Sequence, residues 1–138
     1  MSERVVVYQD QSFRTAFKAA DPHEEQSDQL ENVVHLHELT PYGMLLARVG
    51  SCTAIVVNSY AQHHDIPLRG VTVDAQYDRV FSEDCDDCDP ENEYKEIIRE
   101  KVDFEGDLDD KQLKRLHQVA KACSVRRLLE SGIRVETT

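Results

Sequence analysis

The sequence predicts an α+β fold, an antiparallel sheet with two main helices in the order β-β-β-α-β-β-α-β. Two patterns carry this prediction. Residues 71–81 alternate between apolar and polar side chains, and after an acidic loop at 83–93 the alternation returns at 94–104, which is typical of paired, half-buried strands. Residues 40–64 instead form a mostly apolar stretch with the features of a helix. A chain of 138 residues is expected to fold as one domain, 1–138.

The predicted central helix begins with a capping signature. Thr40 can accept hydrogen bonds from the first free N–H groups, and Pro41 suits the first helical position because it has no N–H to leave unpaired. From 44 to 57 nearly every residue is apolar or small, which predicts burial on most sides, in a core or against a partner subunit. The apolar run is about 14 residues long and contains Arg48, whereas a membrane span takes roughly 20, so we expect no span.

Three short strands are expected before this helix. A β-branched run at 4–8 predicts the first strand, and 13–19 would return beside it as the second strand of a hairpin. Residues 21–29 are acidic, contain a proline and lack an apolar period, so they are expected to form a loop. Residues 32–39 alternate again and would lead directly into the central helix.

A second helix is expected after the strand at 94–104. Asp109 is suited to cap its start. Its apolar residues recur at helical spacing: Leu113, Leu116, Val119, Ala120 and Cys123. Ser131 and Gly132 would end it, and residues 133–135 would add a short last strand.

Composition and charge exclude several classes of function. The chain has 16 basic and 27 acidic residues, a net charge of −11, which argues against nucleic-acid binding because that requires clustered Lys and Arg. No cationic, apolar segment begins the chain, so we expect neither a signal peptide nor a membrane partner, and a cytoplasmic location.

The four cysteines are the main candidates for chemistry. In a cytosolic chain they are expected to be catalytic, redox-active or metal-binding, because stable disulfides are rare there. Cys52 and Cys123 each lie on a predicted helix among apolar neighbours. Each is therefore either a small core residue or a reactive thiol in a rigid site, and spacing alone leaves both interpretations open.

Cys85 and Cys88 form a C-x-x-C unit within the acidic loop. The unit could be half of a zinc site, an auxiliary redox pair or a local loop without a special role. Two cysteines are too few for a structural zinc ion, which takes four ligands, so a second loop from a partner or the pair His63/His64 would have to contribute.

Two further histidine patterns have ordinary explanations. His35 and His37 would share one face of the predicted strand, either as a metal pair or as part of a solvated face. His63 and His64 end the central helix, where positive charge is favourable.

The segments around Cys52 and Cys123 resemble those of a known family. Residues 41, 45–47 and 50–52 resemble the first cysteine region of the OsmC/Ohr family of peroxide-reducing proteins. Residues 106–108 and 122–129 resemble its second cysteine region. The resemblance extends from Asn32 onward and implies an OsmC-like fold.

The resemblance implies thiol peroxidase chemistry that needs no cofactor. Cys52 would attack the peroxide as a thiolate and become a sulfenic acid, and Cys123 would condense with it to a disulfide. A dithiol reductant, lipoyl or thioredoxin-like, would then restore both thiols. The family also implies an intertwined homodimer with the central helices at the interface.

Two positions depart from the family pattern. A glutamate about ten residues before the first cysteine holds an activating arginine in the peroxidase branch, and here that position is Tyr42. The branch has proline after the second cysteine, and here Ser124 takes its place. Glu38 could replace the carboxylate and Arg14 or Arg48 the cation, although each could equally be an ordinary surface charge.

The expected function is reduction of organic hydroperoxides, hydrogen peroxide or both, in oxidative stress defence. The departure at Tyr42 supports a different interpretation, an OsmC-fold protein that binds a small ligand or metal without peroxidase activity. Retention of both Cys52 and Cys123 argues against it, because a binding module needs neither. A structural dimer with inert cysteines is a third hypothesis.

Overall fold

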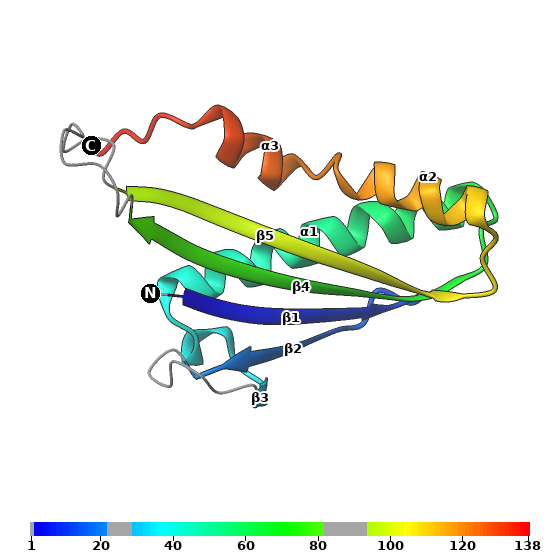
Figure 1. The fold of residues 1–138 in the computed structure, drawn as a ribbon, viewed down its shortest axis with the longest axis horizontal. Coiled ribbons are helices and arrows are strands. Elements are labelled where there is room, and N and C mark those ends of the chain that lie inside the picture. Colours follow the sequence, from blue (N-terminus) through cyan, green and yellow to red (C-terminus); the bar gives the residue numbers. More distant parts are fainter. Residues whose placement is uncertain (1, 22–28, 82–93) are drawn as a thin grey trace.

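A computed structural model describes residues 2–21, 29–81 and 94–138 and has the predicted α+β architecture. Within these ranges one antiparallel sheet has the strand order β3-β2-β1-β4-β5. Its strands are β1 (Ser2–Asp10), β2 (Thr15–Ala20), β3 (Leu30–Val33), β4 (Leu68–Phe81) and β5 (Tyr94–Gly106). The helices are α1 (Pro41–His63), α2 (Asp110–Ala120) and α3 (Ser124–Ser131), with a short 3₁₀ turn η1 (Leu36–Glu38). Figure 1 shows α2 and α3 in succession along the side of α1.

The sheet is built from two hairpins joined through the central strand β1. In β1, Val7 pairs with Phe17 of β2 on one side and with Val73 of β4 on the other, both antiparallel. Val73 pairs in turn with Val102 of β5. The strands predicted at 4–8, 13–19, 71–81 and 94–104 are therefore confirmed, together with the pairing of the last two.

The long helix α1 covers one face of this sheet. Thr40 caps it as predicted, accepting a hydrogen bond from Gly43 N at 3.0 Å. One side of α1 is buried against the inward side chains of β1 and β4; the buried members are Leu46, Ala47, Ala54, Val57, Ala61, Val5, Val7, Val71, Val73 and Ala75. By length and hydropathy α1 could also cross a membrane, a property that it shares with the core helices of folded domains.

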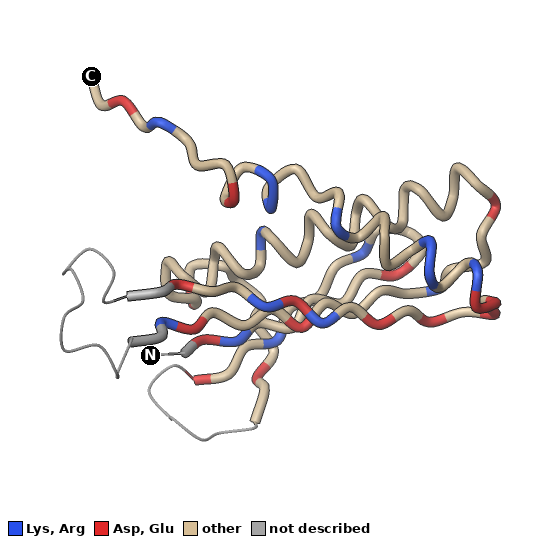
Figure 2. The backbone as a smooth tube through the Cα atoms, turned by 45° about the horizontal axis from the view of Figure 1, so that its top comes forward, with Lys and Arg blue, Asp and Glu red and all other residues tan. Residues whose placement is uncertain are grey.

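The outward side of α1 exposes apolar as well as polar side chains in the single chain. Met44 is 37% exposed and Ile55 is 46% exposed. Arg48 is the one Lys, Arg, Asp or Glu residue between Pro41 and His63, so the tube of α1 is almost free of charge in Figure 2. Within a single chain, α1 is therefore not buried on most of its sides.

The strand predicted at 32–39 is confirmed only at 32–33 and is wrong from 34 onward. β3 ends at Val33, and the chain then turns through η1 to reach the start of α1. Val34 is 80% exposed, so its apolar side chain marks no buried sheet face. His35 and His37 consequently do not share a strand face, although their rings stack at 5.2 Å between centroids.

The second predicted helix is two helices. α2 ends at Ala120, and Cys123 is extended, with φ −63° and ψ 127°, at the N-cap of α3. Cys123 is buried in the structure, as it would be on one continuous helix, so the apolar spacing continues across the break. Periodicity alone therefore could not reveal where the chain changes direction.

The strand predicted at 133–135 is also wrong. Ile133 is 65% exposed and Val135 is 82% exposed, and in the described part of the chain this segment pairs with no strand. A β-branched residue favours a strand only where a neighbouring strand offers a ladder of hydrogen bonds. The loop predicted at 83–93, with Cys85 and Cys88, lies outside the described residues, as does most of the loop predicted at 21–29.

Candidate active site between α1 and α3

Cys52 is held in place by the close packing of α1 on the sheet. A Cβ atom at Gly50 would lie 2.7 Å from Cγ2 of Val7, so the absence of a side chain lets the helix approach β1 at this turn. Thr53, on the buried side, donates from its hydroxyl to Glu100 Oε1 on β5 at 3.0 Å. Cys52 lies between these anchors and is half-buried.

Cys123 is positioned by α2 and by the break that follows it. Asp109 and Gln112 form a capping box at the start of α2, which fixes the direction of the helix. Leu116 and Ala120 then pack into the core. The chain leaves the helix and returns Cys123 to the interior, where its exposure is 0%.

The structure brings the two thiols together and makes them unequal. Burial raises the pKa of Cys52, but this is outweighed by a hydrogen bond from the Cys123 thiol and by donors of Val125 and Ser124 at the start of α3, so the pKa is lowered. Burial raises the pKa of Cys123, and its hydrogen bond to Cys52 raises it further. Cys52 is therefore the more acidic thiol of the pair and Cys123 the less acidic one, a division typical of an attacking and a resolving cysteine.

A groove of about 1110 Å³ is lined by Val49 and Arg126, each three residues from a cysteine, although neither Cys52 nor Cys123 belongs to its lining. Leu45 and Val49 of α1 form part of its apolar wall, and Glu100 and Arg126 belong to its ionisable lining. Burial raises the pKa of Glu100, although the Thr53 hydroxyl and the positive charge of Arg126 oppose the shift. The groove thus offers space for a small molecule next to the helix turn that carries the cysteine.

Sequence comparison now identifies the family. The model of the family described as OsmC-like protein matches residues 34–138. The chain belongs to the OsmC-like family. Among solved structures it is similar to an OsmC-like hydroperoxide resistance protein from Jannaschia sp. CCS1, with a TM-score of 0.61, 12% identity, and coverage of 97% of this chain and 90% of that chain. At this identity the likeness concerns the fold, and it confirms the OsmC-like fold expected from the sequence. No curated protein matches the sequence.

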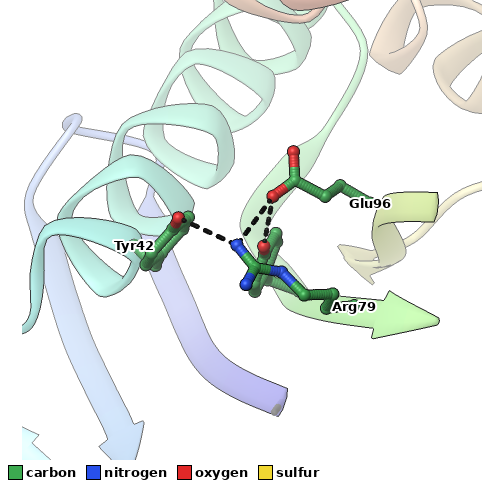
Figure 3. Close-up of polar contacts among 4 residues, drawn as sticks. Tyr42, Arg79 and Glu96 are labelled. Carbon is green, nitrogen blue, oxygen red and sulfur yellow. Dashed lines mark hydrogen bonds and ion pairs between the residues drawn. The ribbon is translucent and has the colours of Figure 1, made fainter. Parts of the chain in front are cut away.

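Tyr42 in this OsmC-like chain belongs to a polar cluster (Figure 3), of which Tyr42, Tyr77 and Glu96 also line the groove. Its ring stacks on Tyr77, with 4.6 Å between centroids. The Tyr77 hydroxyl donates to Glu96 Oε1 at 2.8 Å, and Arg79 Nη2 lies 3.2 Å from the same oxygen and 3.5 Å from the Tyr42 hydroxyl. The hydrogen bond from Tyr77, which has the larger effect, and the one from Arg79 both lower the pKa of Glu96.

The carboxylate beside Tyr42 is therefore Glu96 of β5, whereas Glu38 lies exposed in η1. Glu96 and Arg79 were missed at the sequence level. They are directly opposite each other in the β4–β5 register, so opposite charges at paired positions were the available signal. That signal required the register, which the sequence did not supply.

The candidate cations of this OsmC-like chain lie in different places. Arg14 is exposed in the turn between β1 and β2, where its carbonyl accepts from Asp10 N at 3.0 Å. Arg48 is exposed on α1. Arg126, which sequence reasoning missed, lies one helical turn after Cys123 and interacts electrostatically with it. Arg14 as the activating cation stays a prediction.

Metal ligation finds no support in the described ranges. No group of three or more His, Cys, Asp or Glu residues there is arranged to hold an ion. Cys85 and Cys88 are outside those ranges, so zinc at this pair stays a prediction.

Proposed function

We propose that the chain is a thiol-dependent peroxidase that reduces organic hydroperoxides, hydrogen peroxide or both, in oxidative stress defence. The observation that carries the proposal is that Cys52 Sγ lies 3.7 Å from the hydroxyl of Ser124, the residue after Cys123, and that the two thiols shift each other's pKa in opposite directions. Membership of the OsmC-like family and the similarity to a hydroperoxide resistance protein support it. The groove lined by Val49 and Arg126, each three residues from a cysteine, is the candidate site for the peroxide.

The reaction begins with attack of the Cys52 thiolate on the terminal oxygen of the peroxide. The sulfur–oxygen bond forms as the O–O bond breaks, which gives a Cys52 sulfenic acid and, after uptake of one proton, an alcohol or water. Cys52 is the attacking residue because it is half-buried and ionises more readily, whereas Cys123 is fully buried.

Resolution follows without large movement of either helix. The Cys123 sulfur, already hydrogen-bonded to Cys52, displaces the sulfenic oxygen as water and forms the Cys52–Cys123 disulfide. An external dithiol, lipoyl or thioredoxin-like, then reduces this disulfide by thiol–disulfide exchange and is itself oxidised. No metal or organic cofactor enters this cycle, and the free thiols suit a cytoplasmic location.

Titration of the reduced protein with cumene hydroperoxide and with hydrogen peroxide tests the proposal. We expect one equivalent of an active peroxide to form the Cys52–Cys123 disulfide, seen by peptide mass mapping, because Cys52 lies against the residue that follows Cys123. The faster reaction identifies the preferred peroxide. A second candidate, ligand binding in the groove without peroxide chemistry, predicts that both thiols stay reduced.

We further propose a homodimer formed through the outward face of α1. Ile55→Asp would place a charge in that interface, and burying an unpaired charge costs several kcal/mol, so we expect dissociation to rise at least about tenfold. Analytical ultracentrifugation of wild type and variant measures this. Val34→Asp, at a position 80% exposed, is the matched control. Equal association of all three proteins would contradict an interface at this face.

A further inference from the structure

The first turn of α3 is unusual because no side chain caps it. Cys123 occupies the N-cap without a side-chain hydrogen bond to the helix, and Ser124 is the first helical residue. The first N–H groups of a helix have no partner within it, so they are available to other acceptors. Here the N–H groups of Ser124 and Val125 interact with the sulfur of Cys52, on a different helix.

Ser124 adds a second donor to the same sulfur. Its hydroxyl oxygen lies 3.7 Å from Cys52 Sγ, within range of a hydrogen bond to sulfur. Ser124 therefore offers both a hydroxyl and a backbone N–H to Cys52. A proline at this position, as in the family pattern that the sequence resembles, would offer neither.

The neighbouring Ser51 provides an internal comparison. It precedes Cys52 on α1, but its hydroxyl donates to the Ala47 carbonyl at 2.7 Å, one turn back in its own helix. A serine next to Cys52 in the sequence therefore does not by itself place a hydroxyl against the sulfur. What distinguishes Ser124 is that the fold aims it at the sulfur from α3.

We propose that Ser124 is a positioning residue that, with the first turn of α3, holds the Cys52 sulfur as a thiolate facing Cys123. Burial has the largest single influence on the pKa of this thiol and raises it, and only the S–H, N–H and O–H donors acting together outweigh it. This inference deepens the proposed function, since it concerns the same attacking thiol.

The test is the pH dependence of Cys52 alkylation by iodoacetamide in the reduced protein, followed on the Cys52 peptide by mass spectrometry. Ser124→Ala removes the hydroxyl alone. We expect alkylation near neutral pH to slow about three- to tenfold and its midpoint to move to higher pH, because a charge-assisted hydrogen bond is worth up to about one pKa unit. Ser124→Thr keeps the hydroxyl and should restore the wild-type profile.

Ser124→Pro extends the test to the backbone donor. Proline is favoured at the first helical position, so this variant should fold, which circular dichroism checks, while losing both donors. Its alkylation should be slower than that of Ser124→Ala. Ser51→Ala is the matched control and should leave the profile unchanged.

The outcomes separate this inference from the proposed function. If Ser124→Ala and Ser51→Ala give the same midpoint as wild type, Ser124 does not hold the thiolate and the inference is overturned. If the midpoint rises in Ser124→Ala but wild-type protein forms no Cys52–Cys123 disulfide with peroxide, the inference stands and the peroxidase proposal fails.

Discussion

Cys52→Ser should abolish peroxide reduction, with a rate loss on the order of 10³-fold or more, as is general when a covalent nucleophile is removed. A serine hydroxyl stays protonated at neutral pH and forms no sulfenic acid, so no oxidised intermediate remains for Cys123 to trap. Peroxide consumption with dihydrolipoamide or dithiothreitol as reductant measures the loss. Near-wild-type consumption by Cys52→Ser would contradict the assignment of the attacking thiol.

Cys123→Ser should fail in a different way. Cys52 keeps the donors of α3 and still reacts, but its sulfenic acid has no partner thiol and advances to sulfinic and sulfonic acids in excess peroxide. Intact mass spectrometry should show two or three added oxygen atoms in this variant and none in wild type. The double variant Cys85→Ser/Cys88→Ser is the control, and it should retain the Cys52–Cys123 disulfide. If it does not, the acidic loop takes part in resolution.

Gly50→Val should lower the free energy of unfolding by about 2–3 kcal/mol, the upper part of the range for overpacked cores. The new Cβ would lie 2.7 Å from a methyl group of Val7, which is fully buried at the centre of the sheet and cannot move aside freely. Urea denaturation measures the change. Since Gly50 is two residues from Cys52, the variant should also displace the thiol from α3 and slow its alkylation.

Ser59→Val controls for placing a β-branched residue in α1, because Ser59 is exposed on the same helix. It should cost at most about 0.2 kcal/mol, because Ser and Val have similar helix propensities. Equal stability of the two variants would mean that α1 does not approach β1 as closely as 2.7 Å implies.

The sequence alone determined the elements whose causes are local. Thr40 and Pro41 marked the start of α1, and Asp109 marked the start of α2, because capping depends on a few adjacent residues. Alternation at 71–81 and 94–104 predicted β4 and β5, since the two faces of a half-buried strand meet different surroundings. The resemblance also pointed to Cys52 and Cys123 before any distance was known.

The tertiary structure alone decided how these elements meet. The pairing of Arg79 with Glu96 depends on the register of β4 and β5, and the contact of Ser124 with Cys52 on the packing of α3 against α1. Neither is encoded in a short window of sequence. The same reason explains the wrong predictions: the apolar residues Val34, Ile133 and Val135 suggested strands, but a strand forms only where a partner strand completes its hydrogen bonds. Local pattern fixes what an element can be, and long-range packing decides which of its side chains form a site.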